Sequence, residues 1–133
     1  MIVAVADTHT AVWYLFNNPK LSVRARQAIE GAFREGNEIG VSSISLAEMV
    51  YLAEKGRIPS TAVQDLIRRL LDADYPLHEL PFDASVAQQM TFVNRDEVPD
   101  MPDRIVASAG LRYNVAVISR DEKIRASRIR TIW

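Results

Sequence analysis

Ile2-Val3-Ala4-Val5-Ala6-Asp7 contains the clearest strand pattern of the chain and the acidic residue that follows it. The run 2–6 is short, apolar and partly β-branched, which predicts a strand buried on both faces of a sheet. A helical pattern of apolar residues follows at once over 8–16. Asp7 therefore stands at the carboxyl end of a strand, where ligands bind in open α/β sheets. Taken alone, this position favours an ordinary helix N-cap over a ligand.

The composition is that of a globular domain, with 133 residues of which 48% are hydrophobic and 25% charged. We expect a single domain over residues 1–133. The absence of cysteine excludes disulfides and zinc–thiolate sites, and the two histidines are too few for an all-histidine metal site. We find no signal-peptide pattern and no apolar run near the ~20 residues that span a bilayer. We therefore expect a cytoplasmic protein without membrane attachment.

Charge is unevenly placed along a chain whose net charge is only −1. From Met101 onward there are seven basic and three acidic residues, a net charge of +4, so the preceding hundred residues carry −5. This asymmetry indicates either an anionic partner for the C-terminal part or a solvated helical face. The sequence favours neither alternative.

Helices and strands are predicted to alternate along the chain. Apolar spacing, caps and stop signals predict helices over 8–16, 22–35, 43–55 (or from 45), 59–71, 84–93 and 103–113, and a short helical turn after 121. Apolar runs predict strands over 2–6, 39–42, 77–80, 115–118 and 131–133. This alternation predicts an α/β fold with a mainly parallel central sheet of four to five strands, flanked by helices on both faces.

Four acidic residues recur at one kind of place in this pattern. Asp7 and Asp121 follow strands, Asp103 opens a helix, and Glu48 lies in the first turns of the helix after the second strand. All four can gather at the carboxyl edge of the sheet. Each also has a local explanation: Asp7 and Asp103 as helix caps, Asp121 as a turn residue, and Ser45-Leu-Ala-Glu48 as a capping box. Topology alone leaves the two explanations even.

A cluster of carboxylates needs compensation, because several like charges within a few ångström repel each other. Oxygen ligands without cysteine suit Mg²⁺ or Mn²⁺. Such a cation binds phosphate oxygens and activates water, and basic side chains around it can hold the flanking phosphates of a nucleic acid. The four acids therefore favour phosphodiester chemistry if they share one site.

Several motifs resemble, in order and spacing, those of PIN-domain proteins, and in particular the VapC toxins of VapBC toxin–antitoxin pairs. The motifs are DTH at 7–9 with Trp13, PKLS at 19–22, VSSISLAE at 41–48, PDRIVASA at 102–109 and VISRD at 117–121. Each motif is weak by itself, but together they lie in register over nearly the whole chain. The resemblance implies a single PIN domain that acts as a metal-dependent endoribonuclease.

The resemblance also implies roles for individual residues. Asp7, Glu48, Asp103 and Asp121 would form the catalytic acidic quartet around Mg²⁺ or Mn²⁺. Asp7 and Asp103 would be the most direct ligands, and the other two would bind directly or through water and orient the attacking water. Asp100 is left outside the quartet.

Three further residues have expected positions near the quartet. Ser119 matches a small hydroxyl position often found beside the site in this family, and it also fits a turn residue at a strand end. Arg104, directly after Asp103, is a candidate supporting residue. His9 follows the family pattern, and we expect it to pack beside Trp13.

The partners implied by the resemblance are an RNA substrate such as tRNA or rRNA, a VapB-type antitoxin that covers the acidic groove, and a second copy of the chain in a homodimer. The apolar helices around 49–52 and 63–71 are places for such contacts, although most of those side chains are expected in the core. Alternatives are a PIN-fold RNA-processing nuclease with no toxin role, and a PIN fold that binds RNA or a partner without cutting. A more remote one is a receiver-like Mg²⁺-binding signalling module, which lacks support because the middle strand ends in Leu80-Pro81 and not in an aspartate.

Overall fold

Strand β1 lies at the centre of a sheet in which all neighbouring strands are parallel. The computed structural model describes residues 1–133. The strand order is β3-β2-β1-β4-β5. The strands are β1 (Ile2–Ala6), β2 (Glu38–Ser42), β3 (Leu77–Leu80), β4 (Ala116–Ile118) and β5 (Thr131–Ile132). The helices are α1 (Thr8–Leu15), α2 (Val23–Arg34), α3 (Ser43–Glu54), α4 (Ala62–Leu70), α5 (Ala84–Gln89), the 3₁₀ helix η1 (Met90–Phe92), α6 (Met101–Tyr113) and α7 (Glu122–Ala126).

The strand order creates a switch point beside β1. The chain adds β2 and then β3 on one side of β1, and later returns to add β4 and β5 on the other side. Ligands of such sheets bind where this reversal occurs, outside the carboxyl ends of the strands. The parallel five-stranded sheet confirms the predicted fold class. It also argues against the receiver-like alternative, whose strand order is 2-1-3-4-5.

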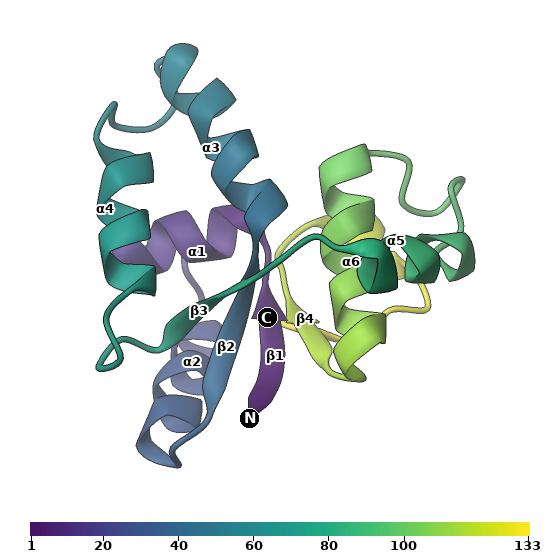
Figure 1. Cartoon of the computed structure of the whole chain (residues 1–133), viewed down its shortest axis with the longest axis horizontal. Coiled ribbons are helices and arrows are strands. Elements are labelled where there is room, and N and C mark those ends of the chain that lie inside the picture. Colours follow the sequence, from purple (N-terminus) through teal and green to yellow (C-terminus); the bar gives the residue numbers. More distant parts are fainter.

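Helices cover both faces of the sheet, with α1, α2 and α4 on one face and α5 and α6 on the other (Figure 1). Alternate residues of β1 point to opposite faces of the sheet and pack against different helices. Ala4 and Ala6 belong to the larger apolar cluster, whereas Val5 packs in the smaller cluster under α6. A strand buried on both sides in this way requires the continuous apolar run that the sequence shows.

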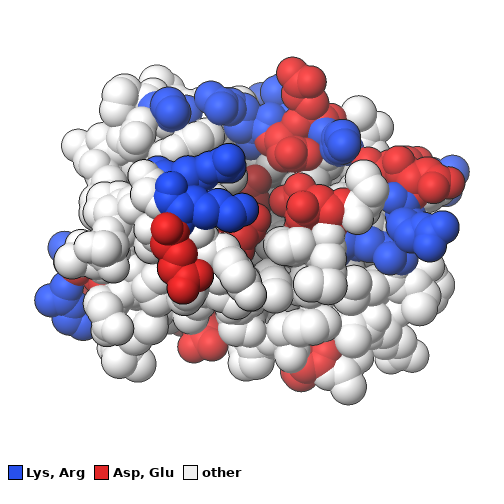
Figure 2. Space-filling view, turned by 90° about the horizontal axis from the view of Figure 1, so that it is seen from above, with Lys and Arg blue, Asp and Glu red and all other residues white.

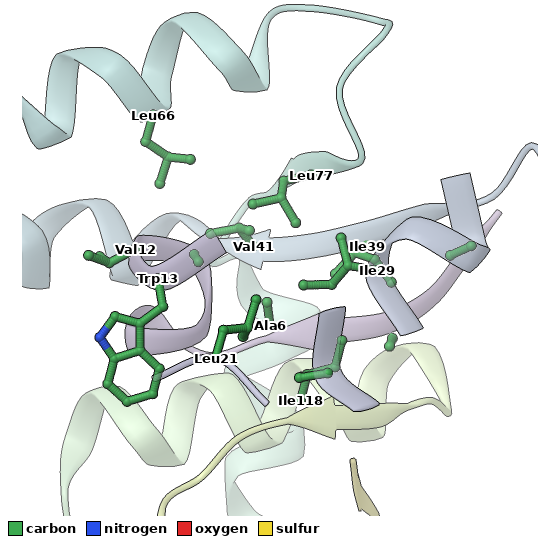
Figure 3. Close-up of a cluster of buried hydrophobic side chains, with 14 of the residues drawn as sticks. Ala6, Val12, Trp13, Leu21, Ile29, Ile39, Val41, Leu66, Leu77 and Ile118 are labelled. Atoms are coloured by element: carbon green, nitrogen blue, oxygen red, sulfur yellow. The ribbon is translucent and has the colours of Figure 1, made fainter. Parts of the chain in front are cut away.

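The larger cluster fixes β1 against the helices that follow it (Figure 3). Ile118 of β4 and Ile39 of β2 flank the strand, and Ile29 of α2 packs over them, all at most 1% exposed. Full burial of a side chain of this size contributes about 1.5–3 kcal/mol. The end of β1, where Asp7 stands, is therefore held in a well-packed part of the molecule. None of the helices is both long and apolar enough to cross a membrane.

Helix α6 begins earlier than predicted because another side chain caps it, whereas helix α3 begins at the earlier of its two predicted starts. Helix α6 starts at Met101, not at Asp103, since Asp100 accepts a hydrogen bond of 3.0 Å from the Asp103 backbone N–H. Helix α3 follows β2 without a loop, starts at Ser43 and is capped by Ser42. Of the alternatives for Asp103, the N-cap is therefore wrong: Asp103 lies in the first turn of α6.

Two other predicted helices are shorter than expected. Helix α4 begins at Ala62 and not at Pro59. Helix α5 ends at Gln89 and tightens into η1, short of the predicted end at Val93. The Arg104 side chain donates to the carbonyl oxygens of Met90 and Val93, at 2.9 and 3.1 Å, and these bonds fix the chain where the helix ends.

Candidate functional site

Asp103, in the first turn of α6, lies among four other carboxylates. Its pKa is raised from 3.8 to about 7, first by burial and then by the negative charges of Asp100, Asp121, Glu48 and Asp7. These charges act on Asp103 from the end of β1, from α3, from the start of α6 and from the turn after β4. The four acids predicted from the sequence therefore lie around one place, at the switch point of the sheet.

Figure 2 looks down on this carboxyl edge of the sheet. Acidic side chains occupy the middle of the face, partly recessed, and lysine and arginine side chains lie around them. A negative centre with a positive rim suits a cation in the middle and the phosphates of a nucleic acid around it.

Asp7 is held rigidly at the end of β1. It is 6% exposed, and its backbone N–H donates to the carbonyl of Ile118 in β4 at 3.1 Å. Its Oδ1 accepts the Thr10 backbone N–H at 2.9 Å, which caps α1. The cap uses one carboxylate oxygen, so the predicted cap is present and the second oxygen is free for another partner.

Glu48 is tied to α1 and not to its own helix start. The Thr8 hydroxyl lies 2.5 Å from Glu48 Oε1 and 2.8 Å from the buried Ser45 hydroxyl. Because a hydroxyl has one proton, Thr8 donates to the charged carboxylate and accepts from Ser45. The capping-box explanation of Ser45 and Glu48 is wrong, since α3 already begins at Ser43.

Asp121 and Ser119 form the turn that leaves β4. Ser119 is fully buried, and its Oγ accepts the Asp121 backbone N–H at 3.0 Å. Asp121 Oδ1 in turn accepts the backbone N–H groups of Lys123 and Ile124, both at 3.0 Å, and so caps α7. Ser119 therefore has the turn role that the sequence allowed, and through this turn it positions Asp121.

Two predictions for neighbouring residues have different outcomes. His9 packs beside Trp13 as expected, with ring centroids 5.5 Å apart. The supporting role predicted for Arg104 is not what its contacts show, because its guanidinium is bound to two carbonyls of the η1 segment. The contacts of Arg104 are thus structural, and it makes no ion pair with the acids.

Asp100, which was left outside the predicted quartet, also lies near the site. It caps α6 and is the carboxylate whose charge raises the pKa of Asp103 most. The signal was present in Asp100-Met-Pro-Asp103, where an acid three residues ahead of another, with a proline between them, is typical of a helix start.

The donors of this site fit a hard divalent cation, although no three acidic or histidine side chains are arranged as ligands of one ion. Mg²⁺ takes one or two carboxylates directly and keeps several waters, so three converging protein ligands are not required. All of the donors are oxygens. Burial first, and then the neighbouring carboxylates, raise the pKa of Asp103 and so disfavour its charged form, and a bound cation would offset both effects.

Comparisons with known proteins agree with this geometry. The family model described as PIN domain matches residues 4–129. Ribonuclease VapC22 of Mycobacterium tuberculosis is 27% identical over 129 residues, which cover 96% of this chain and 94% of that protein.

Solved structures share the fold over nearly the whole chain. VapBC2 from Rickettsia felis bound to a DNA fragment from their promoter is 19% identical, with a TM-score of 0.70 and coverage of 98% and 97% of the two chains. DNA-bound VapBC from Salmonella typhimurium has the same TM-score and coverage at 20% identity. FitAcB from Neisseria gonorrhoeae is 21% identical, with a TM-score of 0.64 and coverage of 97% and 96%.

Proposed function

The chain belongs to the PIN-domain family, as its motifs predicted, and on this premise we propose that it is a metal-dependent endoribonuclease and the toxin of a type II toxin–antitoxin system. The observation that carries the proposal is the charge environment of Asp103, which lies among carboxylates at the switch point of the sheet. The relative named as a ribonuclease supports the activity.

The proposed reaction is hydrolysis of an RNA phosphodiester. Asp7 and Asp103 would hold Mg²⁺ or Mn²⁺, which supplies charge neutralisation at the phosphate and lowers the pKa of water. Glu48 and Asp121 would bind the ion directly or through water and orient the attacking water. Thr8 keeps the Glu48 carboxylate in place, and Ser119 keeps the Asp121 turn in place. The surrounding cations hold the flanking phosphates.

A cleavage assay tests the activity. Purified full-length protein should cut structured RNA, tRNA or rRNA included, with Mn²⁺, and Asp7→Asn and Asp103→Asn should each abolish cutting while keeping the fold. Asp65→Asn is the matched control, because Asp65 pairs with Arg68 on α4 and is not part of the acidic site. Cleavage retained in both acidic-site variants overturns the assignment. RNA that is bound but stays intact supports the non-cutting alternative.

The proposed partner is a VapB-type antitoxin, and the proposed site of action is the cytoplasm, where cellular RNA is cut. The structural neighbours described as toxin–antitoxin complexes support such a partner. Helices α3 and α4, with the residue that follows α4, expose apolar side chains that a partner or a second copy of the chain could cover: Val50, Tyr51, Ile67 and Leu71. Co-purification with the product of an adjacent short reading frame tests the antitoxin. Sedimentation of the chain alone tests the proposed homodimer.

A further inference from the structure

A cavity of about 260 Å³ lies away from the acidic site, between the segment 91–97 and the segment 127–129. The residues that line it include Phe92, Asn94, Glu97 and Arg128. Phe92 is 73% exposed, although it is a large apolar residue. A single exposed aromatic residue is ordinary. Core packing, however, does not account for an exposed aromatic residue that lines a cavity together with an arginine.

The walls of this cavity are held by side-chain hydrogen bonds. Arg104 fixes one wall through the carbonyls of Met90 and Val93, on either side of Phe92. On the other wall, the Ser127 hydroxyl donates to the Ile124 carbonyl at 2.6 Å and accepts the Ile129 backbone N–H at 3.2 Å. These hydrogen bonds hold both walls of the cavity in place, including the segment that carries Phe92.

Helix α7 connects the acidic site to the cavity. Asp121 caps its first turn and Ser127 is its C-cap, so the two sites lie at opposite ends of one helix. Five helical residues span about 8 Å. Helix α6 also connects the two sites. Asp103 lies among the acids, and the next residue, Arg104, is hydrogen-bonded to the cavity wall. A strand of nucleic acid can reach both places at once.

The cations along this path make no ion pair within the chain. Lys123, Arg125 and Arg128 are exposed, and the two ion pairs of the molecule involve other residues, Arg68 with Asp65 and His78 with Glu38. The acids beside this path are Glu122 on α7 and Glu97 in the cavity. Apart from Asp121, which belongs to the acidic site, three cations therefore face two acids along this path, an excess of the sign that binding of a phosphate backbone requires.

We propose that the cavity binds an unpaired base of the RNA substrate, stacked on Phe92, while Arg128 and the cations of α7 hold the phosphates that lead to the acidic site. Unpaired bases stack on aromatic side chains and expose their edges for hydrogen bonds, which Asn94 and Glu97 offer here. The subsite rests on the proposed ribonuclease function and deepens it: the substrate is RNA with an unpaired nucleotide near the cut, and not a continuous duplex.

The test is RNA binding by the full-length protein in EDTA, so that no cutting occurs. The probes are a hairpin with 2-aminopurine at successive loop positions and a fully paired RNA of the same length. Phe92→Ala should weaken hairpin binding at least about fivefold and abolish quenching of the stacked 2-aminopurine, and should leave duplex binding unchanged. Phe92→Leu, which keeps an apolar side chain without a ring face, should also lose the quenching. Arg128→Gln should reduce the slope of log K against log salt by about 0.7.

Matched controls lie at the end of α2, near the opposite edge of the sheet (Figure 1). Phe33→Ala and Arg34→Gln remove the same groups from exposed positions there, and both should bind the hairpin like the unchanged protein. Unchanged hairpin binding by Phe92→Ala, or an equal loss for hairpin and duplex, overturns the subsite. Failure of the unchanged protein to cut RNA with Mn²⁺ would instead overturn the ribonuclease function, so the two failures are distinguishable.

Discussion

The hydroxyl of Thr8 donates a hydrogen bond to the carboxylate of Glu48, across 40 residues of sequence. Thr8 is the first residue of α1 and Glu48 lies in the second turn of α3, so this bond joins the helices that follow β1 and β2. It determines where one of the four predicted acids points. Thr8 itself is 3% exposed and is too enclosed to serve as a substrate contact.

Thr8→Val should lower kcat about tenfold or more and change KM little. Valine keeps the shape of threonine but leaves Glu48 free to turn away from the attacking water, and a hydrogen bond to a charged group is worth about 1.5–3 kcal/mol. Steady-state cleavage of RNA with Mn²⁺ measures both constants.

Thr10→Val is the matched control for this substitution. It also removes a buried hydroxyl from α1, but that hydroxyl donates to the Ile118 carbonyl at 2.9 Å and does not contact Glu48. Both variants should lose about 1–3 kcal/mol of stability, and only Thr8→Val should lose kcat. An equal loss of kcat in the two variants would show that stability, and not the position of Glu48, is responsible.

Gly40→Ala should destabilise the protein by about 1–3 kcal/mol. A Cβ at this position in β2 would lie 2.2 Å from Cδ1 and 2.7 Å from Cγ of Leu80, which packs against Gly40 from the adjacent strand. Urea unfolding gives the change in free energy. Leu80→Ala in the same chain should make the two losses less than additive, because it removes the clash. Gly31→Ala, where the nearest atom is 3.7 Å away on a flexible arginine, should instead stabilise α2 by about 0.5–1 kcal/mol.

Most of the fold was predictable from the sequence, because a strand that is buried on both faces of a sheet appears in the sequence as a continuous apolar run. The run Ile2–Ala6 was predicted to be a strand buried on both faces, and β1 is the central strand of the sheet. Helix boundaries were less predictable, since possible caps stand close together: Ser42, Ser43 and Ser45 are all cap-forming residues, and only Ser42 is the N-cap, with the other two inside α3. Local patterns do not show which of several cap residues the packing selects.

The placement of the four acids at one edge followed from topology, but their partners did not. Nothing near Glu48 in the sequence indicates Thr8, which comes from another helix. The direction of Arg104 was also hidden, because neighbouring residues on a helix point about 100° apart and Asp103 takes the side of the acids. Long-range contacts of this kind need the folded structure.

Removing divalent metal should abolish cleavage, and adding Mn²⁺ to the metal-free protein should raise its Tm by several degrees. A ligand at a hundred times its Kd stabilises the folded state by about 2.7 kcal/mol. Asp7→Asn should lose most of this increase, since asparagine can still cap α1 but carries no charge. Asp65→Asn should keep it. A full increase in Asp7→Asn, measured by thermal unfolding, would contradict binding at the acidic site.

Asp103→Asn should make the metal-free protein more stable at pH 8, while it abolishes cleavage. The folded protein holds the Asp103 proton up to a pKa of about 7, whereas the unfolded chain releases it near 3.8. Between these values the folded state binds more protons, so the contribution of this group to stability falls as pH rises from about 4 to 7 and stays low above that. Asparagine is neutral at every pH and removes this loss.

The expected size of this effect is about 1–2 kcal/mol, because Asp103 is only half-buried and solvent screens part of the repulsion. Urea unfolding in EDTA at pH 5 and pH 8 should therefore show a difference between Asp103→Asn and the unchanged protein that grows with pH. Asp65→Asn should show no such growth. A difference that is the same at both pH values would mean that the other carboxylates do not disfavour the charge on Asp103. Saturating Mn²⁺ should reverse the order at pH 8, because the ion favours the charged carboxylate that the metal-free fold disfavours.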